Sequence, residues 1–555
     1  MIISQEQVFG QVYDLCVVGS GPGGLMVAME YARLNPDQKV LLVEYGELGG
    51  TGKNGLDDGI INHNPTNHHD PYECTNKGFG GTSATWGGRC VLYDPVDFID
   101  RPSLNGGCTW DPSLFEECRP YVDAAAAYFE CGRGGFDLRD IKEARVGPIA
   151  QGFSSDEVTD SALERWSMPT RFGVRYRDDL AKSKNIHLLT GWEARDFGEV
   201  SDAQIIESLD FRSLDGGRNM TVRARDFVVA AGTQETTRLL LRNPRVFVRR
   251  GGVPTALGCY YQGHLSGKIA SVQFHGDPRQ TDYDFGRDSD GCYYRRRFQF
   301  DPEFLVREDL LNTAIWLDNP LYHDPSHGSG AMSAMYLAMV TPVLGKRLAP
   351  PAIAHSITKG RVNRLPRHVW NVLKGLPGSL WIPASIFFRR YCLKRKLPGI
   401  FLYNRKNRYA LHFHAEQIPH FENRMVLAPD GETLEIHYHL TDRDVESVIR
   451  LHEVLDQSLQ KNGCGELRYW FSREELPEAI RAMSRDGIHQ SGTTRIADEP
   501  EKGVVDRNLR VWGTRTLHLC SSSAFPTSGQ ANPTFMLGVF ALRLARHLSE
   551  RHETS

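Results

Sequence analysis

Residues 13–44 read YDLCVVGSGPGGLMVAMEYARLNPDQKVLLVE. The unit begins with an apolar run over 13–18, which predicts a short strand. An Ala-, Met- and Leu-rich stretch over 25–33 predicts a helix. Residues 39–44 form a second apolar run, bounded by turn signals, and predict a second strand that ends in Glu44. Strand, helix and strand in one short unit indicate a βαβ start to the chain.

Three glycines, Gly19, Gly21 and Gly24, stand between the first strand and the helix with the spacing G-x-G-x-x-G. They permit a tight turn and let the backbone approach a pyrophosphate, to which the helix N-terminus presents free N–H groups. Glu44 follows Gly24 by 20 residues, where an acid accepts hydrogen bonds from the adenosine ribose. The unit therefore predicts a dinucleotide site, with an incidental glycine turn as the alternative.

The composition places the chain among globular proteins of more than one domain. Its 555 residues exceed the roughly 250–300 that one core holds. Hydrophobic residues make up 40% and charged residues 24%, which excludes disordered and collagen-like chains. The most apolar stretch, 380–388, contains Pro383 and is too short to cross a bilayer. No basic-then-apolar leader precedes the first strand, so we expect a cytoplasmic protein, with peripheral membrane contact as a variant.

No metal site is expected. The eleven cysteines include no C-x-x-C pair, so they predict neither a disulfide framework nor a zinc site. His63, His68 and His69 lie near a glycine-rich loop over 46–59, but a zinc site needs a fourth ligand and firm geometry. A polar loop is the favoured interpretation.

The charge is unevenly distributed. Residues 325–415 contain 15 Lys and Arg and no Asp or Glu, which leaves 50 cations against 68 acids in the rest of the chain, a net charge of −18 there. Helices predicted over 365–376 and 380–396 place Trp and Phe beside these cations. We favour packing of this basic arm, residues 346–408, on the acidic remainder of the same or a neighbouring subunit in a homo-oligomer. Contact with an anionic membrane surface is the alternative, and no nucleic-acid motif accompanies the charge.

Two further regions carry unusual composition. Residues 78–90 read GFGGTSATWGGRC, a stretch that cannot build a core and suits a backbone laid along a planar ligand, although an ordinary turn remains the alternative. Runs over 186–190 and 226–231, the latter followed by Gly232 and a helix to 241, predict another strand–turn–helix region. The stretch from 263 to 484 lacks the βα pattern and predicts a separate domain.

The last seventy residues hold the block HQSGTTR over 489–495, apolar runs over 509–511 and 517–519 that predict strands, and a loop over 521–530. Asn532 and Pro533 then begin a helix that runs to about residue 548, because Asn at the N-cap and Pro at the first helical position are start signals.

Four segments resemble, in the same order, those of the glucose–methanol–choline (GMC) FAD-dependent oxidoreductases: the G-x-G-x-x-G unit with Glu44, the glycine-rich loop around Trp86, the strand and helix around Gly232, and the block from His489 to Pro533. The last of these is most similar to the sugar-oxidising (pyranose oxidase-like) and sterol-oxidising branches. The resemblance implies an α/β fold with a Rossmann-like FAD-binding domain interleaved with a substrate domain built on a mainly antiparallel sheet with helices. It assigns residues 10–130, 185–262 and 484–555 to the FAD-binding domain, and 131–184 and 263–483, including the basic arm, to the substrate domain.

The resemblance also implies a set of site residues. His489 and Asn532 flank flavin N5, His489 as the base and Asn532 as the residue that orients the alcohol oxygen. Relatives that attach FAD covalently have a His where this chain has Thr85, so non-covalent FAD is expected. Ser521 stands where many relatives have Asp, and we expect it or a neighbour to supply an FAD-side hydrogen bond. The implied cofactor-binding residues are Gly19, Gly21, Gly24, Glu44, Gly81, Thr82, Ser83, Thr85, Trp86, Gly87, Gly232, Ser521, Pro533 and Thr534.

The function expected from this resemblance is oxidation of an alcohol to a carbonyl by hydride transfer to the flavin. Aromatic, moderately polar residues between 260 and 336 favour a secondary hydroxyl of a sugar, glycoside or cyclitol, with sterol-like alcohols as the alternative. Oxygen, a quinone or a carrier protein is the expected electron acceptor.

Rival classes fit less well. A flavin disulfide reductase needs a Cys pair soon after the first unit, and none is there. A nicotinamide dehydrogenase needs neither the Trp86 loop nor the C-terminal block. A flavin monooxygenase stays open, as does a flavoprotein that binds a membrane surface or a partner and has no alcohol substrate.

Overall fold

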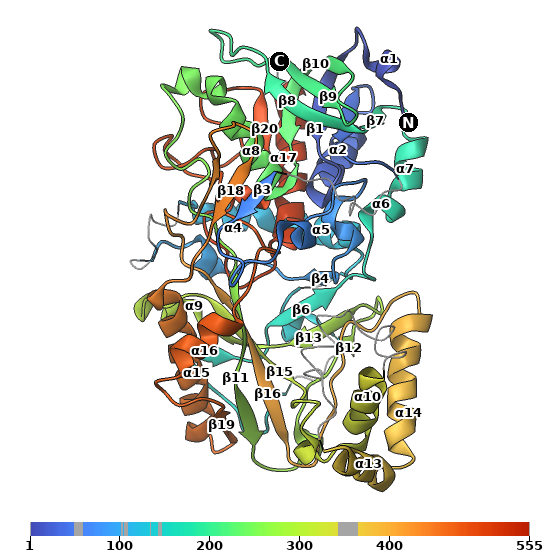
Figure 1. The fold of residues 1–555 in the computed structure, drawn as a ribbon, viewed down its shortest axis with the longest axis vertical. Helices are drawn as coiled ribbons and strands as arrows, with labels where there is room; N and C mark the ends of the chain where they lie inside the picture. Colours follow the sequence, from blue (N-terminus) through green and yellow to red (C-terminus); the bar gives the residue numbers. More distant parts are fainter. Residues whose placement is uncertain are drawn as a thin grey trace.

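The computed structural model describes residues 2–48, 59–101, 104, 109–133, 135–142, 147–341 and 364–553. Figure 1 shows a mixed α/β molecule, with a mainly parallel sheet in its upper half and an antiparallel sheet in its lower half. The predicted fold class is confirmed. Residues 49–58 of the first glycine-rich loop and 346–363 of the basic arm lie outside the described residues.

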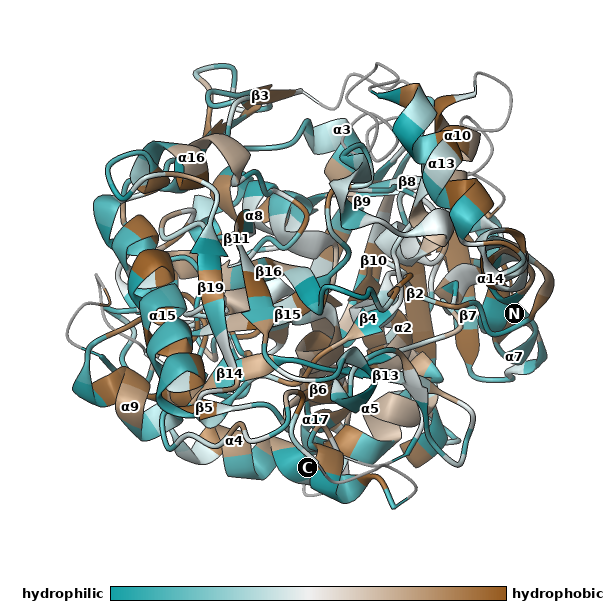
Figure 2. Ribbon diagram, turned by 90° about the horizontal axis from the view of Figure 1, so that it is seen from below, coloured by the Kyte–Doolittle hydropathy of each residue, from teal (hydrophilic) through white to brown (hydrophobic). Residues whose placement is uncertain are grey.

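The upper sheet has seven strands, of which one pairs only with β10. In order they are β7 (Ile186–Thr190), β2 (Val40–Glu44), β1 (Val12–Val18), β10 (Asn219–Val229), β9 (Ser208–Ser213) and β8 (Trp192–Phe197), with β20 (Leu517–Leu519) beside the end of β10. Strands β7, β2, β1, β10 and β20 run parallel, whereas β9 pairs antiparallel with both β10 and β8. Strand β2 is mostly brown in Figure 2 and is buried along its whole length, as expected for a parallel strand that is covered on both faces.

The register of these strands brings the predicted ligand-binding residues to one edge. Val18 of β1 lies beside Val43 of β2 and Val229 of β10. Gly19, Glu44 and Gly232 therefore all stand at the carboxyl ends of neighbouring parallel strands, which is where open α/β sheets bind ligands.

Three helices follow or face that edge. They are α2 (Pro22–Leu34), α8 (Gly232–Arg242) and α17 (Pro533–Glu553). Helices α2 and α17 pack together, and Gly538 allows this because a Cβ there would lie 3.0 Å from the Met26 side chain and 2.4 Å from Phe129. The shorter helices are α1 (Gln5–Val8), α3 (Pro71–Cys74), α4 (Ser113–Cys118), α5 (Val122–Phe129), α6 (Phe172–Arg175), α7 (Arg177–Lys182) and α9 (Pro302–Arg307).

The lower sheet is antiparallel. Its order is β19 (Gly465–Tyr469), β11 (His264–Phe274), β16 (Arg408–Glu416), β15 (Thr313–Asp318), β14 (Phe298–Phe300) and β5 (Val158–Thr159). Helices α15 (Asp442–Lys461) and α16 (Leu476–Met483) cover the β11–β19 side (Figure 1). Two small sheets consist of β12 (Gly286–Arg287), β13 (Tyr293–Arg296), β6 (Leu163–Trp166) and β4 (Arg89–Cys90), and of β17 (Arg424–Leu427), β18 (Leu434–His437) and β3 (Ile60–Asn62).

The described part of the basic arm forms two helices that lie on α10 (Gly330–Val340) at the lower right of Figure 1. They are α13 (Leu365–Lys374) and α14 (Gly378–Phe387), and a π-helical turn over Phe388–Cys392 follows. Both are shorter than predicted. Helix α13 ends at Gly375, before Pro377, and the chain becomes extended at Leu393.

One predicted strand is wrong. Residues 509–511 make only isolated bridges, and Leu509 has a φ of 61°. The Asp506 side chain accepts the backbone N–H groups of Asn508 and Arg510 and so folds this apolar run into a turn. The strand predicted from residue 226 instead begins at Asn219, whereas the strands over 186–190 and 517–519 are confirmed.

The described residues bear on two features, membrane-spanning helices and disulfide bonds. Within those ranges, no helix is both long enough and apolar enough to cross a membrane. The ten described cysteines are all free thiols, and only Cys392 is exposed.

Candidate active site

A pocket lies at the carboxyl ends of β1, β2 and β10, beside the first turns of α2, α8 and α17. Most of the predicted cofactor-binding residues line it: Gly19, Gly21, Glu44, Gly81, Thr82, Ser83, Trp86, Gly232, Ser521, Pro533 and Thr534. Three of the predicted residues, Gly24, Thr85 and Gly87, do not. Residues from the first, middle and last thirds of the chain therefore share one pocket.

The glycines at these turns serve two purposes: some allow close backbone packing and others leave space for a ligand. Gly19 has a φ of 99°, and a Cβ there would lie 2.5 Å from the Ala230 carbonyl oxygen. A Cβ on Gly24 would lie 1.9 Å from the Gly19 carbonyl oxygen, so Gly24 allows helix and strand to pack closely. In contrast, a Cβ on Gly21 or Gly232 would meet no atom within 4 Å. The backbone at these two positions is open to a ligand.

Glu44 holds three segments of the pocket together. Its Oε2 accepts hydrogen bonds from the Ser20 N–H (2.9 Å) and hydroxyl (2.6 Å), and its Oε1 accepts the N–H groups of Gly46 and Gly78, both at 3.0 Å. Burial raises the pKa of Glu44, and the four hydrogen bonds oppose that shift. Both carboxylate oxygens are thus already occupied by protein donors.

The glycine loop forms a 3₁₀ turn over Gly81–Ala84, not a flat extended segment. A Cβ on Gly81 would lie 2.9 Å from Gly21 Cα, so the two glycine loops nearly touch. Arg171 secures the turn by donating hydrogen bonds to the carbonyl oxygens of Ser83 (2.9 Å) and Trp86 (2.6 Å). Thr85 is exposed, and its hydroxyl oxygen accepts a hydrogen bond from the Asn76 amide (2.5 Å).

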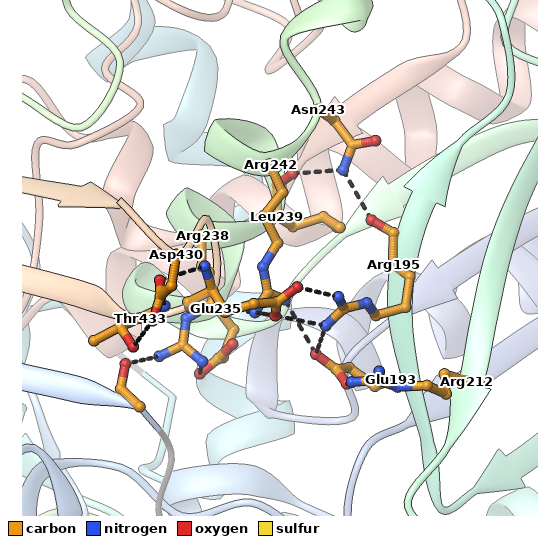
Figure 3. Close-up of polar contacts among 12 residues, drawn as sticks. Glu193, Arg195, Arg212, Glu235, Arg238, Leu239, Arg242, Asn243, Asp430 and Thr433 are labelled. Atoms are coloured by element: carbon orange, nitrogen blue, oxygen red, sulfur yellow. Dashed lines mark hydrogen bonds and ion pairs between the residues drawn. The ribbon is translucent and has the colours of Figure 1, made fainter. Parts of the chain in front are cut away.

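An ion network forms part of the pocket wall, and Figure 3 shows it in detail. Glu193 of β8 pairs with Arg195 (3.0 Å), Arg212 (3.2 Å) and Arg242 of α8 (3.1 Å). Glu432, in the turn between β17 and β18, also pairs with Arg195 and Arg242. The network ties the upper sheet, α8 and the small β17–β18 sheet together around the pocket.

His489 and Asn532 meet at one end of the pocket. Ile488 and Gln490, on either side of His489, line the pocket, as does Pro533, which follows Asn532. The Asn532 amide nitrogen donates to His489 Nε2 at 2.5 Å. His489 Nε2 therefore carries its lone pair toward this point, and its proton is on Nδ1.

Asp486 fixes the loop that carries His489. Its Oδ1 accepts the backbone N–H groups of Gly487 (2.8 Å), Ile488 (2.9 Å) and His489 (3.2 Å). Its Oδ2 lies 3.4 Å from His489 Nδ1. Burial opposes ionisation, but His489 and His264 nevertheless hold the pKa of Asp486 well below its usual range. The carboxylate thus faces the nitrogen of His489 that holds the proton.

Two further histidines complete the site. The His264 Nδ1–H donates to Asp486 Oδ2 (3.2 Å), and the His414 Nδ1–H donates to the Gln530 carbonyl oxygen (2.7 Å). Burial lowers the pKa of His264 and, aided by His264 and Arg89, lowers that of His414 further. Both imidazoles are therefore neutral, with lone pairs on Nε2.

The three rings form one cluster. The rings of His264 and His414 stack at 4.2 Å, and each meets the His489 ring edge-on, at 5.1 and 5.3 Å. Their ligand-capable nitrogens lie within 4.8 Å of one another, close enough to hold a metal ion. Three polar atoms here, His264 Nε2, His489 Nδ1 and Asn532 Oδ1, are buried without a hydrogen-bond partner in the described structure.

The sequence-based analysis found His489 and Asn532 but missed Asp486, His264 and His414. A signal for Asp486 was its position three residues before His489. His414 and His264 carried no comparable signal, because they are brought together by the pairing of β11 with β16. The histidines near the first loop do not come together, since His63 pairs with Glu435 (3.0 Å) and His68 bonds to the Tyr261 hydroxyl (2.7 Å).

Comparisons with known proteins agree with this picture. Residues 419–541 match a family model described as GMC oxidoreductase. A 2-methyl-1,2-propanediol dehydrogenase from Mycolicibacterium austroafricanum is 32% identical over 65 residues, and the match spans 12% of this chain and 12% of that enzyme. The shared segment is thus short in both proteins.

Two solved structures are similar over the whole chain. Pyridoxine 4-oxidase from Mesorbium loti has a TM-score of 0.52 and 17% identity, covering 96% of this chain and 99% of that one. A formate oxidase from Aspergillus oryzae, studied for the effect of a mutation on FAD modification, has a TM-score of 0.52 and 15% identity, covering 98% and 99%. Residues 419–541 are thus similar to the GMC oxidoreductase family, and the chain as a whole shares its fold with these two solved structures.

Proposed function

We propose that the protein binds FAD and oxidises an alcohol to a carbonyl compound. The observation that carries this proposal is the contact of His489 Nε2 with the Asn532 amide, 2.5 Å apart, at the end of a glycine-lined pocket. An alcohol hydroxyl needs a base to take its proton and a donor to hold its oxygen, and here His489 and the Asn532 amide stand side by side to supply both. One of the similar solved structures, the formate oxidase, carries FAD, as its description states, which supports FAD as the cofactor proposed here.

The residues of the pocket fit FAD. Gly21 and Gly232 leave open backbone at the N-terminal ends of α2 and α8, where N–H groups favour a pyrophosphate. The first turn of α17 supplies Pro533 and Thr534 to the same pocket, and its N-terminus favours negative charge on the ring system. When bound, FAD supplies the hydride acceptor. Glu44 holds Ser20 and Gly78 in place, and a ribose hydroxyl would take over the hydrogen bond that Ser20 now donates.

The reaction assigns a role to each polar residue. His489 Nε2 accepts the hydroxyl proton as the carbonyl forms, and the Asn532 amide orients the substrate oxygen. Asp486 keeps the His489 proton on Nδ1, so that the Nε2 lone pair, which now accepts from the Asn532 amide, can take the hydroxyl proton when an alcohol enters, and Asp486 stabilises the imidazolium that results. Ser521 keeps a hydroxyl proton to donate to the cofactor, since its oxygen accepts the Ser523 N–H at 3.2 Å.

For the substrate we propose a polyhydroxy alcohol, such as a sugar, glycoside or cyclitol. His264 and His414 offer Nε2 lone pairs but no protons at this point, so they suit a second hydroxyl group, which donates. A sterol-like alcohol would leave these buried acceptors without partners, at a cost of about 1–3 kcal/mol each. The name of the dehydrogenase that matches a short segment of this chain is that of a diol enzyme.

The domain division follows from the same assignment. We assign residues 10–130, 185–262 and 484–555 to the FAD-binding part, and residues 131–184 and 263–483 to the substrate part. Non-covalent FAD is supported by Thr85, which has no nucleophilic ring nitrogen and lies outside the pocket lining. Oxygen, a quinone or a carrier protein then removes the electrons, in the cytoplasm or at a membrane surface.

The test is anaerobic mixing of the purified yellow protein with a panel of alcohols while the flavin absorbance is recorded. Bleaching by polyols, followed by recovery with air or a quinone, is the expected result. Bleaching only with NAD(P)H, or a colourless protein that binds no FAD, would contradict the proposal.

A further inference from the structure

Helices α13 and α14 of the basic arm turn their polar side chains inward. His368 is fully buried, bonds through Nδ1 to the Ser333 hydroxyl (3.0 Å) and stacks on Tyr336 at 4.4 Å. The Asn371 amide donates to the Pro325 carbonyl oxygen (2.9 Å). A Cβ on Gly330 would lie 2.0 Å from the Ser379 hydroxyl, so α10 and the arm are in close contact. The arm is thus held against the molecule by polar contacts.

Apart from the buried Ile386, the large apolar side chains of the same helices point away from the molecule. Trp381 is 73% exposed, Trp370 64% and Leu380 62%. The exposed apolar residues of the arm are Leu365, Val369, Trp370, Leu373, Leu376, Leu380, Trp381, Ile382, Phe387 and Phe388. Soluble proteins rarely expose so many large apolar side chains in one short segment, and such a surface usually contacts a membrane or another protein.

The same segment carries cations that form no ion pair with a described acidic residue. The described Lys and Arg of the arm are Arg364, Arg367, Lys374, Arg389, Arg390, Lys394, Arg395, Lys396, Arg405, Lys406 and Arg408. None of them forms an ion pair with a described Asp or Glu, and three of them, Arg390, Arg395 and Lys406, donate to backbone carbonyl oxygens instead. Arg389 and Arg364 act electrostatically on Asp284 and Asp324, but no ion pair with a described acidic residue holds these cations, and most of the positive charge remains available.

We infer that α13 and α14 bind the surface of an anionic lipid bilayer. The two tryptophans and the leucines enter the interface, and the surrounding Lys and Arg meet the headgroups. Each helix has ten residues, too few to cross the bilayer, so the helices lie in its surface. A symmetric contact with a second copy through this surface would place the same cations against each other, which disfavours that partner.

The experiment is flotation of the full-length protein with phosphatidylcholine vesicles that contain or lack phosphatidylglycerol, at low and high salt. We expect co-flotation with the phosphatidylglycerol vesicles, weakened by salt. The Trp370→Ser/Trp381→Ser variant should lose it, and Lys394→Gln/Lys396→Gln should bind about fivefold more weakly for each lysine removed. Phe9→Ser/Val174→Ser and Lys182→Gln/Lys184→Gln, which alter exposed residues outside the arm, are the matched controls and should bind as the wild type does.

Thermal melts and oxidation of a soluble alcohol should be unchanged in the arm variants, because the altered side chains are exposed and lie outside the candidate active site. Absence of flotation with anionic vesicles would overturn the inference, as would flotation that the arm variants leave intact. A lipid-free dimer that the Trp370→Ser/Trp381→Ser variant dissociates would assign the surface to a second copy instead, and would equally overturn it.

Discussion

Asp486 Oδ2 contacts the backbone N–H of His264 at 2.7 Å across 222 residues of sequence. The same carboxylate receives the His264 and His489 imidazoles at 3.2 and 3.4 Å. One buried acid therefore joins the loop of the proposed base to the first residue of β11, and it sets the orientation of two imidazoles at once.

Replacement of Asp486 by Asn should impair the reaction while the cofactor stays bound. Loss of the anion removes the negative charge that faces His489 Nδ1 at 3.4 Å, so His489 is oriented less firmly as the proton acceptor. We expect kcat to fall about 10- to 100-fold with a smaller change in KM. Steady-state rates, with the flavin content measured in parallel, check this. A raised KM with an unchanged kcat would contradict the role of Asp486 as a positioning residue.

The same substitution should change how stability depends on pH. The pKa of Asp486 is lower in the folded protein than its ordinary value of about 3.9, so this carboxylate contributes stability that is present above about pH 4 and lost as the pH falls below it. Thermal melts between pH 3 and 7 should therefore show the wild type losing more stability on acidification than Asp486→Asn. Parallel losses in the two proteins would speak against an ionised Asp486.

His414→Phe should separate substrate classes. It keeps the ring and the stacking on His264 but removes the Nδ1–H bond to the Gln530 carbonyl oxygen, which affects all substrates alike, and the Nε2 lone pair. Polyols therefore lose an additional hydrogen bond of about 1 kcal/mol, or roughly fivefold in KM. Simple monohydric alcohols should be affected far less. Rate measurements on matched diols and monoalcohols test this, and equal effects on both would remove His414 from substrate recognition.

Removal of metal ions should leave the alcohol reaction unchanged, because the three histidines are assigned here to substrate and proton. Prolonged treatment with a chelator, followed by elemental analysis and a rate measurement, checks this. If activity is lost on chelation and restored by one metal ion, the chain holds a metal site, and loss of that ion in His414→Phe would place it at His264, His414 and His489 rather than at His63, Glu435 and His437.

Acid precipitation should release all of the flavin into the supernatant, since Thr85 cannot form a histidyl link. Flavin left in the acid pellet would show a covalent link.

Glu44→Ala should weaken FAD retention without altering relative rates among alcohols, because Ser20, Gly46 and Gly78 lose their common acceptor. Glu44→Gln, which keeps one acceptor oxygen, should retain more FAD than Glu44→Ala.

The elements that could be predicted from the sequence are those set by residues close together in the chain. The βαβ unit, the strands over 186–190 and 517–519 and the helix that begins at Pro533 follow from local patterns of apolar, turn and capping residues. His489 and Asn532 were found because each lies in a recognisable motif.

The parts that sequence reasoning missed depend on contacts between distant segments. His264 and His414 lie on adjacent antiparallel strands and reach the site only through sheet pairing and through Asp486. The run over 509–511 was misread because Asp506 folds it into a turn. The outward apolar face of the arm could not be predicted, since the pattern of α13 does not reveal that α10 accepts its polar side.

The central claim is that His489 is the base for alcohol oxidation, and its most direct test is anaerobic flavin reduction by a polyol in the wild type and in His489→Ala. Loss of a general base should slow the flavin bleaching about 10²- to 10⁴-fold while the FAD content stays at the wild-type level. If His489→Ala bleaches its flavin at the wild-type rate, His489 is not the base and the account of this site is wrong.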